Sequence, residues 1–575
     1  MEKKIAYASS LAFLPFVILL IYFKLAIAKD TIVITARDIA KMNVRKIWDV
    51  LNQVPGISAG ESFVSIRGSN KVKVFLDGRP INDPTSPFRA IRFDLVSLED
   101  VKRIEIYIGR GALKYGANTS GGVILIFTKK GKRLSGNVKS YLGNFDTSHI
   151  SANLRTGSSS FNAGMSFGYE YTGGYLPNND KRKKRFGVKF DYVKDKTKLS
   201  FSFDYTSKKK GIYGRKEYPT LHYRRKSNMY SYSFGFKRKK VKSLFFLNSA
   251  KTENRDPERN IYNFLKVRKL GEDTFFNLEL KKWGNLVFGN SFRLDRAKSK
   301  SFGSKQEYSI AFFETYEFLL FKKISFSFGI RETIYSEYED QINPEIKISY
   351  ADKRWSLSFT YMRTNNIPTF YQKYEKTSSK EPNPDLDIEV SDNLSLSFFM
   401  KPSSNLSLGL SFFHNKISKR ITYVYDRNRW IGHYENLGKV TYKGVDVSLD
   451  LRITENISVK TNYLYIEAID ESSGNWIPGK PRHKIYSDFF FNPIKDISLV
   501  FNVKFESKQY TRSDNKASVP ARAIYGLRIE YTPCWIKKKT EFFMEMKNLL
   551  DEEYCYGDGY PAPPFMCFFG VNFSF

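Results

Sequence analysis

The chain has 575 residues, with 93 Lys and Arg against 59 Asp and Glu, and a formal net charge of +34. Aromatic residues make up 16% of it, yet the mean hydropathy is negative, at -0.43. A soluble core seldom needs so many Phe and Tyr. A lipid-facing β-barrel does, because alternate residues of its strands face hydrocarbon. After residue 29 no apolar run of about 18 residues occurs, which argues against a helical membrane protein.

Residues 1–28 are typical of an export signal. Lys3 and Lys4 give a basic start, the stretch from Ile5 to Phe23 is mostly apolar, and Ala26-Ile27-Ala28 is a small-x-small cleavage site. We expect cleavage after Ala28, with a retained membrane anchor as the alternative.

A short β-branched run follows this site. An extended segment of this kind can add itself as a strand to the sheet of a partner. An ordinary first strand of the next domain is the alternative, and the residues alone do not separate the two. The run consists of Asp30, Thr31, Ile32, Val33, Ile34, Thr35 and Ala36.

Residues 38–131 are predicted to form a compact α/β domain. Apolar residues at helical spacing predict a short helix from Val44 to Val54, which ends at Pro55-Gly56. The segment from Ile81 to Phe93 is rich in turn residues and is predicted to be a loop. We expect strands at Phe63–Ile66, Val72–Leu76, Val101–Ile108 and Gly122–Thr128.

Residues 132–575 alternate strand-like segments with turns. Segments such as "FNAGMSFGYEY" and "KLSFSFDYT" show period-two alternation, and short connections (157–160, 194–197) trade places with long ones (172–185, 207–227). This is the up-and-down pattern of outer-membrane barrels. At roughly 20 residues for a strand and its connection, the segment predicts about 22 strands.

Three basic runs lie between strand-like segments, at Lys181–Arg185, Lys208–Lys210 and Lys237–Lys240. We interpret them as solvated loop tips that face the anionic headgroups of outer-membrane lipid and lipopolysaccharide. Nucleic-acid binding is the alternative, but no recognised nucleic-acid motif accompanies the runs. The three Cys and five His show no metal-ligand spacing, and no nucleophile elbow occurs, so we expect neither a metal centre nor an enzyme.

The last residues also alternate, with Phe569, Val571, Phe573 and Phe575 on one face. Such a final strand has to pair with the first strand to remove both edges of the sheet.

Short motifs in the α/β domain carry a resemblance to a known family. They are Ile66-Arg67-Gly68, Asp77-Gly78, Arg103-Ile104-Glu105, Tyr115-Gly116 and Gly121-Gly122-Val123-Ile124. In this order they resemble the plug domain of TonB-dependent outer-membrane receptors, and later segments such as "ENLGKVTYKGVDVSLD" and "KNLLDEEY" resemble the barrel of that family. The chain has Arg110-Gly111-Ala112 where the family usually has Arg-Gly-Pro.

The resemblance implies a membrane all-β fold: an antiparallel transmembrane β-barrel of about 22 strands in the bacterial cell outer membrane, with an N-terminal α/β plug inside its lumen. It implies a monomer without a cofactor that imports a scarce metal chelate, either a ferric siderophore or cobalamin. Residues 29–37 resemble the TonB box, so Asp30 to Ala36 would bind a periplasm-spanning TonB protein that delivers the work of opening. Phe575 resembles the family's assembly signal. A passive porin or an adhesin is the alternative.

The same resemblance suggests the functional residues. Structural and gating positions of the plug are Arg67, Gly68, Asp77, Gly78, Arg103, Glu105, Gly121 and Gly122. Of these, Arg67, Arg103 and Glu105 are expected to bond to the barrel wall. Ligand contacts from below are expected from Asn82, Asp83, Thr85, Ser86, Phe88 and Arg89, and from above from Tyr175 and Tyr213, although these Tyr suit an interfacial belt equally well.

The ligand class stays open. The position of the box and the modest barrel length resemble cobalamin receptors, while the basic loops suit an anionic ferric siderophore. Asn383-Pro384-Asp385-Leu386 has no His in the 25 residues after it, which counts against haem. A Cys555–Cys567 disulfide and a calcium site at Asn178, Asn179 and Asp180 also stay open.

Overall fold

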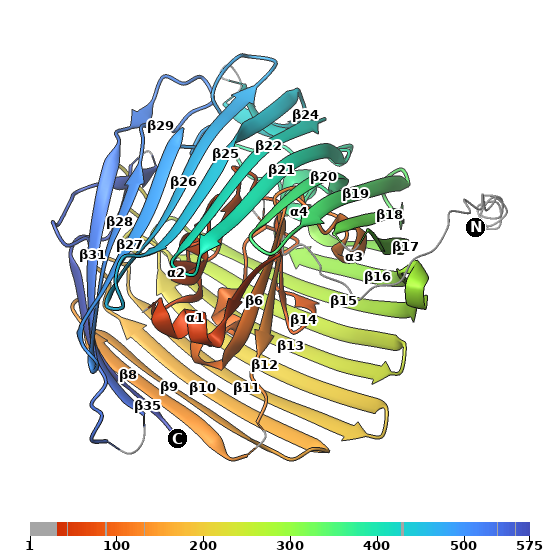
Figure 1. Cartoon of the computed structure of the whole chain (residues 1–575). Helices are drawn as coiled ribbons and strands as arrows, with labels where there is room; N and C mark the ends of the chain where they lie inside the picture. The colour runs from red at the N-terminus through yellow and green to blue at the C-terminus, as the bar shows by residue number, and fades with distance from the viewer. Residues whose placement is uncertain are drawn as a thin grey trace.

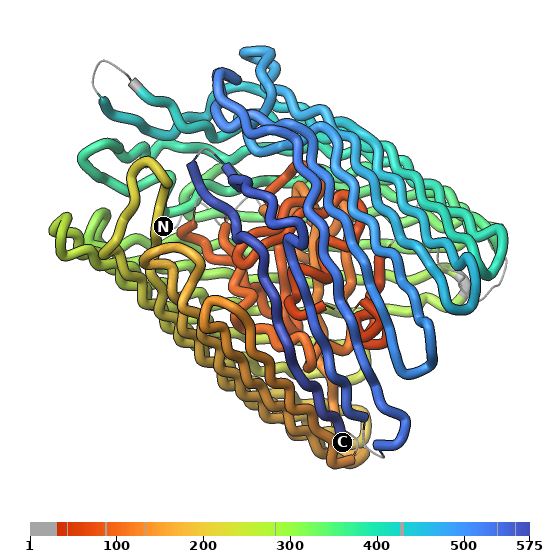
Figure 2. Tube along the Cα trace, turned by 90° about the vertical axis from the view of Figure 1, so that its left-hand side faces the viewer, coloured from red at the N-terminus to blue at the C-terminus, as the bar shows by residue number. Residues whose placement is uncertain are grey.

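The computed structural model describes residues 31–42, 44–86, 89–131, 133–321, 323–426, 430–536, 539–557 and 559–575. The expected signal segment, Asp30 and Phe88 lie outside this part. The described residues form a closed ring of strands with a smaller α/β domain, the plug, inside it (Figure 1). The view along the flank shows the plug enclosed by the strands over much of their length (Figure 2).

The plug is built on a five-stranded sheet with strand order β1-β6-β7-β4-β5. Strands β4 and β7 run parallel, and the other neighbours run antiparallel. A small hairpin, β2–β3, lies beside the sheet. The elements are β1 (Ile32–Thr35), α1 (Ala36–Lys41), α2 (Ile47–Asn52), β2 (Ile57–Ala59), β3 (Val64–Ile66), β4 (Val72–Leu76), β5 (Arg79–Pro80), the 3-10 turns η1 (Phe93–Leu95) and η2 (Leu98–Asp100), β6 (Val101–Ile108), α3 (Ala112–Tyr115) and β7 (Gly122–Thr128).

The predicted strands β4, β6 and β7 have the bounds that the sequence suggested, and helix α2 is shorter than the predicted one. The core of the plug is formed by aliphatic side chains that are almost completely removed from solvent, among them Val50, Leu51, Ile104, Ile124 and Ile126. Because β1 belongs to this sheet, the plug begins within the segment predicted as the TonB box.

The barrel closes through 22 antiparallel strands, as predicted. Its strands are β8 (Ser135–Gly143), β9 (Thr147–Gly157), β10 (Phe161–Thr172), β11 (Lys181–Lys194), β12 (Thr197–Gly211), β13 (Arg224–Arg238), β14 (Val241–Asp256), β15 (Ile261–Glu279), β16 (Asn285–Ser299), β17 (Gly303–Leu320), β18 (Ile324–Tyr335), β19 (Gln341–Ala351), β20 (Trp355–Asn366), β21 (Glu389–Ser403), β22 (Leu406–Ser418), β25 (Lys439–Arg452), β26 (Ile457–Asp470), β27 (His483–Ile494), β28 (Ile497–Glu506), β31 (Arg522–Tyr531), β32 (Thr540–Lys547) and β35 (Met566–Ser574).

Smaller elements decorate the connections: η3 (Lys281–Trp283), α4 (Phe370–Tyr374), β23 (Ile421–Asp426), β24 (Ile431–Asn436), β29 (Gln509–Tyr510), β30 (Ser518–Val519), β33 (Cys555–Gly557) and β34 (Tyr560–Pro561). Connections at one end of the barrel are short, such as 195–196 and 404–405. Those at the other end include 367–388 and 548–565. We refer to these as the short-turn end and the long-loop end.

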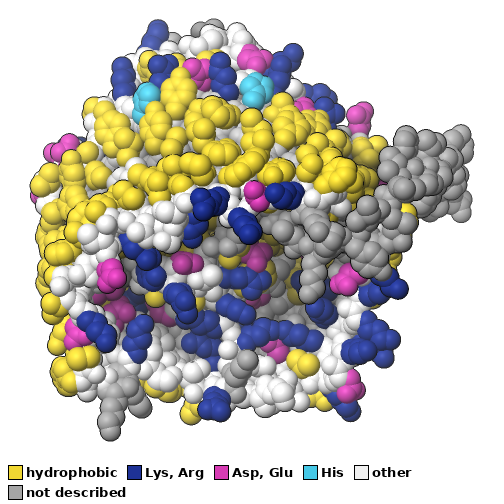
Figure 3. All heavy atoms as spheres, in the orientation of Figure 1, with side chains coloured by type: hydrophobic (Ala, Val, Ile, Leu, Met, Phe, Trp, Pro, Cys, Tyr) yellow, Lys and Arg dark blue, Asp and Glu magenta, His cyan; other side chains and the backbone are white. Residues whose placement is uncertain are grey.

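Side chains of the barrel strands alternate between the lumen and the outside. On β13, for example, Tyr230, Tyr232 and Phe234 are exposed on the outward face, whereas Ser231 and Ser233 are buried against the lumen. Such outward side chains give the wall an apolar surface, and Figure 3 shows hydrophobic side chains gathered over the upper wall with Lys and Arg gathered below them. No helix in the described part of the chain is long and apolar enough to cross a membrane.

The final strand closes the ring as predicted, because β35 pairs with β8. The backbone of Phe575 also exchanges two hydrogen bonds with Gly136, of 2.9 and 3.1 Å.

The interpretation of the basic runs as loop tips was wrong for the first two runs and for half of the third. Lys181–Arg185 lies in β11 and Lys208–Lys210 lies in β12, while the third run ends β13 and forms the turn to β14. The first two runs lack apolar alternation because their inward members face acidic side chains of the plug, as Lys183 and Lys208 do with Asp94.

Candidate functional site

The segment predicted to bind a partner forms the edge of the plug sheet. Ile32, Val33, Ile34 and Thr35 pair antiparallel with β6, and the other edge of β1 has no strand beside it in the five-stranded sheet. Ile34 is buried, and Thr35 also caps α1 in a capping box with Asp38. The structure therefore shows the ordinary first strand that the sequence left open, with one edge that is free for strand addition.

Buried ion pairs attach the plug to the barrel around its circumference. Arg67 Nε donates to Asp446 Oδ2 on β25 at 2.5 Å, as expected for this residue. The expectation was wrong for Arg103 and Glu105, which pair with each other at 2.6 Å within the plug. Further contacts that the sequence did not suggest include Arg45–Glu545 at 2.5 Å, Asp94–Lys208 at 2.7 Å and Asp100–Arg155 at 2.7 Å.

Two glycines of the predicted set are required by close approach. A Cβ atom at Gly68 would lie 2.6 Å from Ile466 Cδ1 of the barrel wall, and the residue has φ +79°. A Cβ atom at Gly122 would lie 2.0 Å from the carbonyl oxygen of Tyr107, and this residue has φ +131°. Side chains are therefore excluded at both positions, at the wall and inside the plug sheet.

The β4–β5 hairpin fastens the plug to one side of the barrel. Its turn residue Asp77 accepts hydrogen bonds from Thr128 and, at 2.8 Å, from Lys189 of β11. The next residue after the turn, Arg79, is completely buried, forms an ion pair with Asp204 of β12 and donates to Ser202 at 2.5 Å.

Two cavities lie on either side of this hairpin. The cavity toward the short-turn end, of about 280 Å³, is lined by Asp77, Gly78 and Ser202 among others. The cavity toward the long-loop end, of about 80 Å³, has Pro80 in its lining. We call these the inner and the outer cavity, and the hairpin separates them.

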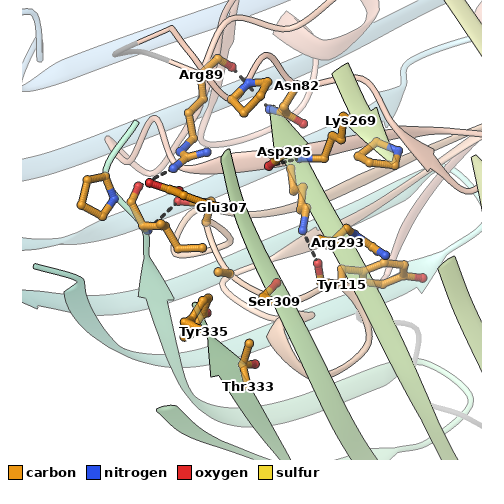
Figure 4. A pocket seen from close by; sticks show the side chains of 18 of the residues that line it. Asn82, Arg89, Tyr115, Lys269, Arg293, Asp295, Glu307, Ser309, Thr333 and Tyr335 are labelled. Carbon is orange, nitrogen blue, oxygen red and sulfur yellow. Dashed lines mark hydrogen bonds and ion pairs between the residues drawn. The ribbon is translucent and has the colours of Figure 1, made fainter. Parts of the chain in front are cut away.

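The outer cavity lies between the plug and strands β15 to β18 (Figure 4). Its walls include the plug loop around Asn82, the end of α3, and Ile367 and Pro368 of the long connection after β20. Its volume holds only a few water molecules, so it accommodates one polar group of a ligand rather than a whole chelate.

Cations outnumber carboxylates in this cavity. The charged side chains that line it are Lys73, Arg89, Lys269, Arg293 and Arg331 against Asp295 and Glu307. Lys269 pairs with Asp295 at 3.1 Å, and Arg293 makes two hydrogen bonds, of 2.6 and 2.8 Å, to Asp273 outside the cavity. Two of the cations thus have carboxylate partners.

The other three cations donate to backbone carbonyls. Lys73 Nζ donates to Tyr115 at 2.6 Å, Arg331 to Leu113 at 2.9 Å, and Arg89 to Ile367. Arg89 Nε is buried without a hydrogen-bond partner among the described residues. Burial, followed by repulsion from Arg293, lowers the pKa of the Lys73 amine well below its usual value. An anion entering this cavity would offer Arg89 Nε a hydrogen-bond acceptor. It would also raise the pKa of Lys73 toward its usual value.

The structure gives the predicted ligand residues different positions. Asn82 and Arg89 line the outer cavity. Asp83 instead accepts hydrogen bonds from Thr85 and pairs with Arg92, so Asp83 and Thr85 stabilise the loop itself. Ser86 follows in the same loop and is half-buried outside the cavity lining.

Residues of the long loops also have structural partners. The hydroxyl of Tyr175 donates to the carbonyl of Pro561 at 3.1 Å, which joins two loops at the rim. Asp180 forms an ion pair with Arg224, so its carboxylate is already neutralised where calcium was considered. Tyr213 and Tyr175 are both outside the lining of the outer cavity. All three Cys are free thiols.

Sequence reasoning missed Lys73, Lys269, Arg293 and Arg331. The signal that could have found the last two is the period-two pattern, because each points inward while its apolar strand neighbours point outward. The closed ring and the position of the plug determine which inward cations line the same cavity. The sequence of a single strand does not reveal either of them.

Two families match the chain. The family "TonB dependent receptor-like, beta-barrel" matches residues 137–549, and the "TonB-dependent Receptor Plug Domain" matches residues 24–123. The chain belongs to the TonB-dependent receptors. The short-turn end of this receptor is therefore periplasmic and its long-loop end faces outward, as in outer-membrane barrels generally.

Similar proteins carry names for two ligand classes. The vitamin B12 transporter BtuB of Vibrio cholerae is 20% identical over 95% of this chain and 92% of that protein. The iron-regulated outer membrane virulence protein of the same species is 21% identical over 94% and 92%. A crystal structure of the ferric enterobactin receptor PfeA of Pseudomonas aeruginosa has a TM-score of 0.81 at 19% identity, and covers 95% of this chain and 100% of that one.

Proposed function

We propose that this TonB-dependent receptor imports an anionic ferric chelate of the siderophore class. The observation that supports this proposal is the outer cavity, where Lys73, Arg89 and Arg331 have only neutral hydrogen-bond partners. A carboxylate or catecholate oxygen of a chelate would provide the missing negative charge. Cobalamin is the second candidate, favoured by the similarity to the vitamin B12 transporter named above, but it offers no comparable concentration of negative charge.

The ligand has to bind in two layers, because the outer cavity is too small for a complete chelate. One anionic group would enter the cavity beside Asn82 and Arg89, and the long loops would cover the remainder. A hydrogen bond to a charged group contributes about 1.5–3 kcal/mol, so each cation in contact adds roughly tenfold to a hundredfold in affinity.

Opening the plug requires work from the TonB partner, for which β1 is the proposed attachment point. A partner strand would add to the free edge of β1, and force along that strand would be applied to β6 through their four paired residues. Arg110 Nη2 donates to Thr31 at 2.5 Å, which ties the start of this strand to the loop after β6. The load would therefore enter the plug at the edge of its sheet.

Binding measurements with the purified receptor test the ligand class. A ferric tris-catecholate, a ferric tris-hydroxamate and cyanocobalamin are titrated separately, and the tris-catecholate should bind most tightly. Arg331→Met combined with Lys73→Met should weaken this binding at least tenfold. The matched control Lys416→Gln plus Lys443→Gln removes two cations from the outer face of the barrel and should leave binding unchanged.

The ligand proposal is refuted if cyanocobalamin binds more tightly than both chelates, or if the two cavity substitutions have no effect on chelate binding. Circular dichroism and resistance of the barrel to unfolding in cold SDS show whether the variants are folded.

A further inference from the structure

The inner cavity is the more cationic of the two cavities beside the β4–β5 hairpin. Nine Lys and Arg residues line it against three Asp residues. Its volume of about 280 Å³ is more than three times that of the outer cavity, and approaches the roughly 300–1,000 Å³ of common small-molecule sites. Lys102, Lys237 and Lys242 of its lining are exposed, so the cavity opens into the periplasm. It therefore accommodates a larger part of a ligand than the outer cavity does.

The barrel wall beside the inner cavity carries small side chains. Strands β10 to β13 lie side by side in the lower wall (Figure 1), and more than half of their inward residues that line the cavity are Gly or Ser. On the opposite wall, bulky side chains of β22, β25 and β26 contact the plug, among them Phe413, Tyr442 and Ile466. The plug thus fits tightly on one side of the lumen and leaves space on the other. The small residues of the lining include Gly164, Ser166, Gly187, Ser200, Ser233 and Gly235.

Three lysines form a row at the periplasmic mouth of the inner cavity. Lys198, Lys237 and Lys242 lie on β12, β13 and β14, and Lys237 is directly opposite both of the others in the strand register. They have the strand parity of inward residues such as the buried Ser233 and Phe246. Like charges at directly opposite positions destabilise a sheet. The row therefore carries a cost that an anion bound between the lysines would remove.

Carboxylates compensate only part of this row. Lys198 pairs with Asp191 at 3.1 Å, but Asp191 also pairs with Lys130 at 2.7 Å, so one carboxylate serves two cations. Lys237 and Lys242 have no carboxylate partner within the described part of the chain. Two cations at the mouth are thus available to an anionic ligand.

The segment after β7 contributes a lining cation whose hydrogen bond goes to a neutral group. Lys129 Nζ donates to the backbone carbonyl of Glu99 at 2.7 Å. Burial, followed by repulsion from Arg155, lowers the pKa of the Lys129 amine. An anion in the inner cavity would raise this pKa toward its usual value.

The β4–β5 hairpin separates this cavity from the outer one. Asp77 and Gly78 line the inner cavity and Pro80 lines the outer one, so displacement of the hairpin would join the two into one passage. We infer that the inner cavity is a second anion site, which receives the chelate when the hairpin moves and holds it before release into the periplasm. The identity of the ligand as an anionic chelate rests on the proposed function, whereas the cavity and its cations do not.

Exposure makes the inner site weaker than the outer one. Lys237 and Lys242 face solvent at the mouth, whereas Arg89 and Arg331 of the outer cavity are buried. Exposed charges interact through a high dielectric and are screened by salt, so an anion binds less tightly at the mouth. A chelate that has passed the hairpin therefore dissociates toward the periplasm.

Protection of lysine side chains from acetylation tests the site in the purified wild-type receptor. Acetylation of each Lys is followed by peptide mass spectrometry, with an anionic ferric tris-catecholate or an uncharged ferric tris-hydroxamate as the probe. The tris-catecholate should slow acetylation of Lys237 and Lys242 at least fivefold, and high salt should abolish this protection. The tris-hydroxamate should give no protection. Lys194, which faces outward at the same end of β11, is the internal control and should react equally in all samples.

Uptake by a variant tests the part that the site plays in import. Lys237→Gln/Lys242→Gln should retain the tight binding of the tris-catecholate, but its energised uptake at limiting chelate should fall at least fivefold. The matched control Lys194→Gln/Arg238→Gln removes two outward cations from the same end of β11 and β13, and should transport as the wild type does. Resistance to unfolding in cold SDS shows that both variants are folded.

Each part of the inference has its own contrary result. Equal acetylation of Lys237 and Lys242 with and without the tris-catecholate would overturn the inner site, even where the chelate binds the outer cavity tightly. Equally strong protection by the uncharged probe would overturn the preference for an anion, and unchanged uptake by Lys237→Gln/Lys242→Gln would overturn a part in import. Failure of the proposed function looks different, because tight binding of the tris-catecholate is then missing while protection of the two lysines persists.

Discussion

Replacing Arg79 by Met should loosen the hairpin that separates the outer and inner cavities. The guanidinium of Arg79 is completely buried and contacts Asp204 and Ser202 of β12, and Asn248 of β14 donates to the carbonyl of Pro80 at 2.8 Å. Methionine fills much of the same volume, so the main consequence is that the carboxylate of Asp204 stays buried without its partner.

Removing one partner of a buried ion pair costs about 3–5 kcal/mol, because the remaining charge is neither solvated nor paired. That cost destabilises the closed position of the hairpin, in which it is packed against β12. At about 1.4 kcal/mol for each tenfold change, the opening equilibrium should rise by about a hundredfold or more. Hydrogen–deuterium exchange of the peptide from Val72 to Ile81 measures this directly, and single-channel conductance in planar bilayers should show brief openings in Arg79→Met only.

The double variant Arg79→Met/Asp204→Leu provides the decisive comparison. It removes both charges, so protection of the hairpin should return to within about tenfold of the wild type. Arg67→Met, which breaks the pair with Asp446 on β25, serves as the control and should leave exchange of this hairpin unchanged. Unaltered exchange in Arg79→Met, or a double variant as unprotected as the single one, would refute the reasoning.

Three further predictions follow from the plug and the final strand. Val33→Pro removes a ladder donor from β1, so energised uptake should be lost while chelate binding to purified receptor is retained; normal uptake would count against coupling at β1. An anion in the outer cavity should raise the lowered pKa of Lys73, so binding takes up a proton and affinity should fall as pH rises between the free and bound pKa values. Calorimetry in buffers of different ionisation enthalpy measures this uptake, which Lys73→Met should remove. Deleting Phe575 should reduce the amount of folded barrel in the outer membrane, scored by heat-modifiable migration in gels, and unchanged assembly would argue against a C-terminal signal.

Local sequence patterns predicted those parts of the fold whose causes are local. Strands β4, β6 and β7 are apolar runs bounded by turn residues such as Asp77-Gly78, and their bounds were correct. The strand number of the barrel followed from the average spacing of period-two segments. Arg67 was expected to reach the wall, but its partner Asp446 is 379 residues away in the chain. That pairing is determined only by the closed ring and by the orientation of the plug inside it.

The outer cavity was only partly predictable for the same reason. Asn82 and Arg89 belong to a loop with several turn residues, and the resemblance to the plug family led us to expect that this loop faces outward. Lys73 and Arg331 come from a buried plug strand and a barrel strand, and the period-two pattern could show only that Arg331 points inward. Their meeting is a property of the tertiary structure.

The basic runs show why strand parity matters more than composition at the end of a barrel. In β11, Lys183 points inward to Asp94 of the plug, and the next residue, Lys184, points outward. The sequence "KRKKR" looks uniform, yet its members have different partners because the side chains of a strand alternate between faces. A register shift of one residue would exchange the two sets, leaving the carboxylates of the plug unpaired and placing the outward cations inside the lumen. The ion pairs between β11 and the plug therefore also fix which cations of the run face outward.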